Sequence, residues 1–103
     1  AHLPLWGTIS TVIAATTGDR PQYRIDRGAI HGIIEGIQLD VYQRENRQIK
    51  LGRVKVVAVA ATSATVRLHK LERVVRERGQ TLGVGDLVYS KQRPVHYEKR
   101  DLQ

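Results

Sequence analysis

The stretch Tyr23-Arg-Ile-Asp-Arg-Gly28, continued by Ala29-Ile-His-Gly-Ile-Ile-Glu-Gly36 and Gln38-Leu-Asp-Val-Tyr42, decides the fold. Its two ends alternate apolar and polar side chains, which is typical of half-buried β-strands. Its middle holds glycines four residues apart around three isoleucines, and it is too short for a stable isolated helix. We therefore expect two strands joined by a compact apolar connection that plugs one end of a small barrel.

Four further strands are indicated along the chain, at residues 6–14, 49–60, 64–69 and 84–89. The longest of them changes phase at Val56-Val57, so a bulge or bend is expected there. Residues 71–78 carry apolar side chains at helical spacing and are followed by Gly79, which predicts one or two turns of helix. The predicted fold class is all-β: a small, partly open six-stranded β-barrel of SH3 or OB size with one short helical excursion.

The chain has 103 residues and a single Trp, with no Phe, Met or Cys. This length suits one domain, with the barrel over residues 1–93 and a polar, basic C-terminal tail over residues 94–103. The core must come from Val, Ile, Leu and Ala. The absence of cysteine excludes disulfides, thiolate catalysis and cysteine-based zinc sites. Because the sequence begins with Ala1 just before a strand, we expect a fragment or a processed product.

The formal net charge of +7 predicts an anionic neighbour, although a solvated basic surface explains it as well. If the middle strands are neighbours, their cations form one partner-binding face, for which the candidates are Arg24, Arg44, Arg47, Arg53, Lys55 and Arg67. Reversing Arg53 and Arg67 together to Glu is expected to keep the fold and weaken assembly. A second set of residues is predicted to form structural turns: Gly28, Gly32, Gly36, Gly85 and Asp86.

Nothing in the sequence indicates an enzyme. There is no Gly-x-Ser-x-Gly nucleophile turn, and the four histidines lack the spacing of a metal site. The glycines at 83 and 85 precede a strand and not a helix, so no phosphate cradle is predicted. We expect no catalytic residues, no metal and no cofactor.

The pattern Arg-Gly28-x-x-x-Gly32-Ile-x-x-Gly36-x-x-Leu39-x-Val41, followed by Gly52-x-Val54-x-Val56 and a late Val84-x-Asp86-x-Val88, resembles a known module. It is similar to the small β-barrel at the C-terminus of the flagellar assembly protein T of the periplasmic H-ring. Similar modules occur in curli-transporter-like lipoproteins and in the LysM-containing peptidoglycan-binding protein associated with the type IV pilus secretin. The chain departs from this pattern in its high arginine content and in its basic segment Arg73–Arg78.

The resemblance implies a non-catalytic structural module of a cell-envelope complex, periplasmic or envelope-associated, in a flagellar or pilus ring. Its partners would be proteins, in an oligomeric ring, or an anionic cell-wall or lipid surface, and an open barrel edge could pair with a neighbouring subunit. The alternative is a cytoplasmic nucleic-acid-binding barrel, with basic residues as its rim and Trp6, Tyr42 and Tyr89 for stacking.

Overall fold

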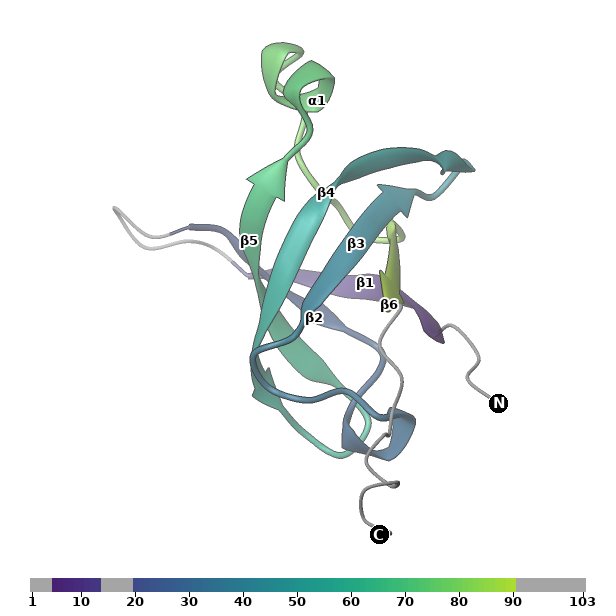
Figure 1. Ribbon diagram of the computed structural model, residues 1–103, viewed down its shortest axis with the longest axis vertical. Helices are drawn as coiled ribbons and strands as arrows, with labels where there is room; N and C mark the ends of the chain where they lie inside the picture. Colours follow the sequence, from purple (N-terminus) through teal and green to yellow (C-terminus); the bar gives the residue numbers. More distant parts are fainter. Residues whose placement is uncertain (1–4, 14–19, 91–103) are drawn as a thin grey trace, which may run out of the picture.

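The computed structural model describes residues 5–13 and 20–90 and shows a closed barrel of six antiparallel strands (Figure 1). One short α-helix lies at one end of the barrel, and a 3₁₀ turn lies in the connection at the other end. The elements, in chain order, are β1 (Leu5–Ile13), β2 (Gln22–Ile25), η1 (Ala29–His31), β3 (Gln38–Gln43), β4 (Asn46–Val59), β5 (Ala64–Leu71), α1 (Arg73–Glu77) and β6 (Leu87–Ser90). The predicted all-β class, the six strands and the single short helical excursion are confirmed.

The barrel is closed, so the expectation of a partly open wall with a free edge is wrong. Around the wall the order is β1-β2-β5-β4-β3-β6, and β1 pairs with β2 on one side and with β6 on the other. The closing element is β6, only four residues long, in which Val88 pairs with Gly7 of β1 and with Val41 of β3. Every strand has a neighbour on each side over at least part of its length, so no strand of the wall leaves a whole side unpaired.

The inner face of the wall is one dry aliphatic core. The strands alternate, so the odd-numbered residues of β3 point inward while Gln38, Asp40 and Tyr42 point outward. The predicted inward direction of Tyr23 and Ile25 is confirmed, since both are at most 1% exposed. The buried apolar set is Ile9, Tyr23, Ile25, Ile33, Leu39, Val41, Leu51, Val54, Val56, Ala64, Val66, Val75, Leu82 and Val88.

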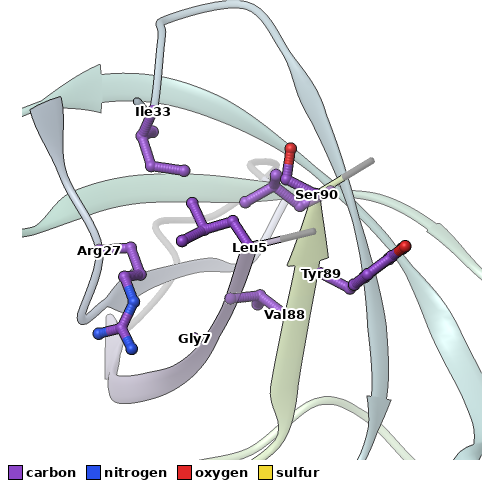
Figure 2. Close-up of a pocket in the computed structure, with 8 residues that line it drawn as sticks. Leu5, Gly7, Arg27, Ile33, Val88, Tyr89 and Ser90 are labelled. Atoms are coloured by element: carbon purple, nitrogen blue, oxygen red, sulfur yellow. The ribbon is translucent and has the colours of Figure 1, made fainter. Parts of the chain in front are cut away.

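The connection between β2 and β3 plugs the barrel with one isoleucine, not three. Ile33 is buried and is directed toward Leu5 (Figure 2), whereas Ile30 and Ile34 are 69% and 60% exposed. The hollow beneath Ile33 is too narrow to admit a water molecule. The expected apolar plug is therefore correct in place but smaller than predicted, because the 3₁₀ turn rotates Ile30 outward.

The bulge predicted in the longest strand is present. Val56 pairs with Val66 and Ala58 with Thr65, so Val57 is the extra residue. The helical segment also ends as predicted, with Gly79 at φ 70° directly after the last turn of α1.

The predicted turn glycines serve two different needs. Gly32, Gly36 and Gly85 have φ values of 89°, 96° and 95°, in the left-handed region that favours glycine. Gly28 is extended instead, and a Cβ there would lie 2.5 Å from the carbonyl oxygen of Ala60. Asp86 closes its turn by accepting a hydrogen bond from the Gly83 amide at 2.8 Å.

Candidate binding surfaces

The outer wall over β2, β5 and β4 carries a cluster of cations, here called the basic face: Arg24, Arg53, Lys55, Arg67 and Lys70. Two pairs lie directly opposite each other on β4 and β5, Lys55 with Arg67 and Arg53 with Lys70. Directly opposed residues on one face of a sheet have Cβ atoms about 5 Å apart, and like charges in such positions destabilise the sheet. Arg24 lies diagonally to Arg67, because Arg67 is opposite Gln22 in the next strand.

Most of the basic face has no neutralising partner. Among the described residues, Arg24, Lys55, Arg67 and Lys70 form no ion pair with a carboxylate, and Arg24, Lys55 and Arg67 are exposed. The protein therefore holds a like-charged cluster that no carboxylate of residues 5–13 and 20–90 neutralises, apart from Asp40 beside Arg53.

Arg53 differs from the other members of the basic face because it neutralises a buried carboxylate. Asp40 is 7% exposed although it lies on the outer face of β3. Its Oδ1 accepts a hydrogen bond from Arg53 Nε at 3.2 Å, and Lys50 Nζ lies 3.4 Å from the same oxygen. Removing a cation from a buried carboxylate is costly. The expectation that Arg53 can be reversed in charge without harm to the fold is therefore not supported by its contacts.

Arg44 lies at the β3–β4 hairpin, and its contacts hold two turns together. Its guanidinium donates to the Val84 carbonyl and lies 3.1 Å from Glu45, and its backbone amide donates to Asp86 Oδ1. Its side chain also covers Gly85, where a Cβ would lie 3.1 Å from Arg44 Cδ. Arg44 thus connects the β3–β4 hairpin to the turn at residues 83–86 and is separate from the basic face.

Three aromatic rings, Trp6, Tyr42 and Tyr89, form a second surface on β1, β3 and β6, here called the aromatic cluster. The Trp6 centroid lies 4.6 Å from that of Tyr89 and 5.8 Å from that of Tyr42, with interplanar angles of 46° and 55°. Tyr42 and Tyr89 meet nearly edge to face, at 80°. The Arg47 guanidinium lies over Trp6, 4.5 Å from the ring centroid. In the closed strand order, the three strands of this cluster are neighbours, with β6 between β1 and β3.

The six cations predicted as one partner-binding face therefore occupy three places. The basic face contains Arg24, Arg53, Lys55 and Arg67. Arg44 connects two turns, and Arg47 belongs to the aromatic cluster. Lys70 was missed because its outward direction depends on a register shift between Arg53 and Val54. The alternation of apolar and polar residues in the sequence predicts that Tyr42 points outward. Its position beside Trp6 was not predictable, because it depends on β6 pairing with both β1 and β3.

Asp26 is half-buried at the crossing of β1 and β2, where it serves as a structural carboxylate. It accepts hydrogen bonds from the Thr8 amide and hydroxyl, both at 2.8 Å. Burial by itself would raise the pKa of the Asp26 carboxyl, but these two hydrogen bonds and the nearby Arg27 charge outweigh it and lower the pKa below its usual value.

Within residues 5–13 and 20–90, no three His, Cys, Asp or Glu side chains are grouped so that they could hold a metal ion. The same residues include no helix with the length and apolar character of a membrane span. Comparisons of this chain with protein-family models, with curated proteins and with solved structures find no match.

Proposed function

We propose that this chain is a non-catalytic binding module of a bacterial cell-envelope assembly, and that its basic face holds an anionic partner surface. The observation that carries this proposal is the pair Lys55 and Arg67, two cations directly opposite each other, neither of which forms an ion pair with a carboxylate in the described part of the chain. Such a pair costs stability in the free protein. An anionic partner would remove that cost.

The envelope setting rests on the resemblance of the glycine and core pattern to ring-associated barrel modules. The pattern residues have the structural roles that such a module needs. Gly32 and Gly36 adopt left-handed turns, and Leu39 and Val41 lie in the core. The closed wall leaves no described strand with a whole side unpaired, so contacts with neighbours in a ring would be made mainly by side chains.

A test of this function is co-sedimentation of the protein with phosphatidylglycerol vesicles and with purified peptidoglycan, over a range of salt concentrations. The charge reversals Lys55→Glu and Arg67→Glu in one variant should weaken binding strongly. A matched control carries Arg76→Glu and Arg78→Glu, which lie on and just after α1, and its net charge changes by the same amount. Once the effect of net charge is corrected for, this control should bind nearly like the wild type. Equal losses in both variants would mean that binding follows net charge and would refute a role for the basic face.

Single-stranded nucleic acid is a second candidate, favoured by one row of residues across the wall. In that row Tyr89 lies beside Asp40, Asp40 beside Arg53 and Arg53 beside Lys70, so one row holds an aromatic ring and two cations with the Asp40 carboxylate between them. Titration with oligothymidine would separate the two functions. About four phosphate contacts predict a slope of about −3 in a plot of log affinity against log salt.

A further inference from the structure

We propose that the aromatic cluster is a second binding site, which takes a proline-containing, acidic segment of a partner protein in extended polyproline conformation. The site is formed by Trp6, Tyr42 and Tyr89, with Arg47 at its edge. It lies on β1, β3 and β6 and shares no residue with the basic face.

The angles between the rings favour a pyrrolidine ring over a flat base. Neighbouring rings in the cluster are inclined by 46°, 55° and 80°, so they pack against one another without forming a flat platform. Together with Arg47 and Gln48 they line an open hollow on the surface. Trp6 already has Tyr89 and Arg47 within 5 Å of its ring centroid, so a nucleobase would compete with them for its surface. Polyproline helices dock into aromatic-lined grooves of this kind.

The polar atoms of the cluster suit a ligand rich in acceptors. Among the described residues, Trp6 Nε1 and the hydroxyls of Tyr42 and Tyr89 have no hydrogen-bond partner, although all three side chains are half-buried. A polyproline segment forms no internal hydrogen bonds, so its carbonyl oxygens are free to accept from these donors. The partly buried rings thus carry three donors for which the described residues supply no acceptor.

The charge at the site specifies the acidic character of the segment. Arg47 is exposed at the rim and forms no ion pair with a described carboxylate. Lys50 lies opposite Tyr42 in the strand register, but its charge is paired with Asp40, so Arg47 carries the charge preference of the site. An Asp or Glu next to the proline would therefore face positive charge, whereas a Lys there would be repelled.

The single Trp of the chain makes the site directly observable, because Trp6 is the only source of tryptophan fluorescence. The probe is a synthetic peptide of the repeat Pro-Pro-Glu, titrated into the full chain while Trp6 emission is recorded. We expect a saturable change. Two control peptides replace every Pro by Ala or every Glu by Lys, and each should bind at least about fivefold more weakly, the equivalent of one exposed charge contact or one lost docking group.

Two sets of variants test how the site recognises the peptide. Arg47→Glu, at an exposed position, should weaken binding of the glutamate peptide and strengthen binding of the lysine peptide, and such a reversal of preference cannot come from loss of folding. Tyr42→Phe and Tyr89→Phe keep the rings and remove the hydroxyls, and each should weaken binding about threefold to tenfold. The basic-face variant Lys55→Glu with Arg67→Glu should bind the peptide like the wild type, which separates this site from the proposed function.

Three results would overturn the proposal. The first is an unchanged Trp6 emission on addition of the Pro-Pro-Glu peptide. The second is equal binding of the alanine peptide, which would mean that proline is not recognised. The third is tighter binding of oligothymidine than of the peptide with quenching of Trp6, which would assign the cluster to nucleic-acid stacking.

Discussion

Two cation pairs on adjoining strands look alike in sequence and differ in physical role. Arg53 lies opposite Lys70 and Arg67 lies opposite Lys55, all four on the outer wall of β4 and β5. Among the carboxylates that the structure describes, one lies beside the first pair, since Asp40 is 3.2 Å from Arg53, and none forms an ion pair with the second. Arg53 therefore compensates the buried negative charge of Asp40. Arg67 instead adds to the positive charge of Lys55, which no described carboxylate compensates. This difference separates an arginine with a structural contact, Arg53, from one without a described ion pair, Arg67.

The comparison is tested most strongly by charge reversal. Arg53→Glu places a second carboxylate beside buried Asp40, and we expect the free energy of unfolding to fall by about 3–5 kcal/mol. Arg67→Glu should change it by less than about 0.5 kcal/mol, because it leaves no buried charge unpaired. Urea denaturation of the two single variants measures both values. Similar losses in the two variants would contradict the division of the basic face into structural and free cations.

A smaller effect is expected when the carboxylate itself is neutralised. Asp40→Asn keeps the shape of the side chain but loses its charge-assisted hydrogen bond to Arg53 and its contact with Lys50, which should cost about 1–3 kcal/mol. Glu45→Gln is the matched control, since its ion pair with Arg44 is mostly exposed and should contribute little. An Asp40→Asn protein as stable as the wild type would show that Asp40 does not anchor this part of the wall.

The loss of stability at low pH should depend on Asp26. Unlike Asp40, this carboxylate is held mainly by hydrogen bonds from Thr8. Because its pKa is lowered in the folded protein, Asp26 stabilises the fold above the carboxyl pKa of the unfolded chain. This contribution is lost as the pH falls through the lower, folded value. Thr8→Val removes the hydroxyl donor, so it should raise the Asp26 pKa and move the onset of acid destabilisation to higher pH.

NMR titration of the Asp26 carboxyl carbon, alongside thermal melts between pH 2 and 6, would check this prediction. Thr17→Val gives the same chemical change outside the described residues and serves as the control. An unchanged Asp26 pKa in Thr8→Val would show that the Thr8 amide and the Arg27 charge lower the pKa without help from the hydroxyl.

The smallest expected effect comes from neutralising one arginine in each pair, which should change stability in opposite directions. Arg67→Gln relieves the repulsion with Lys55 and should raise stability by at most about 0.5 kcal/mol at low salt. This gain should shrink as salt screens the pair. Arg53→Gln should instead lower stability at every salt concentration. Melting temperatures of both variants at low and high salt are sufficient to detect the difference.

Local patterning predicts much of this fold because strand alternation and turn residues are written in neighbouring positions. Tyr23, Ile25, Leu39 and Val41 all point inward as their alternation indicates, and the phase change at Val56 marks a real bulge. Barrel closure was not predictable in this way. It depends on β6, whose four residues pair with strands more than 40 positions away along the chain.

The candidate sites depend on such long-range pairing even more than the fold does. The role of Arg53 follows from its position opposite Asp40, and the aromatic cluster follows from β6 bringing Tyr89 beside Trp6. Gly52 is a similar case, because a Cβ there would collide with the Lys70 carbonyl oxygen of the next strand. In each case the residue type is visible in the sequence, but its partner is supplied only by strand register.

Closure of the wall also bears on how such a module changes during evolution. A sheet with a free edge recruits neighbours through main-chain groups that every sequence possesses, so its associations are hard to tell apart and prone to runaway growth into aggregates. A closed wall presents its neighbours with side chains, which mutate one at a time. Paralogous copies could thus acquire mutually exclusive partners through a few surface substitutions while the shared scaffold stayed unaltered.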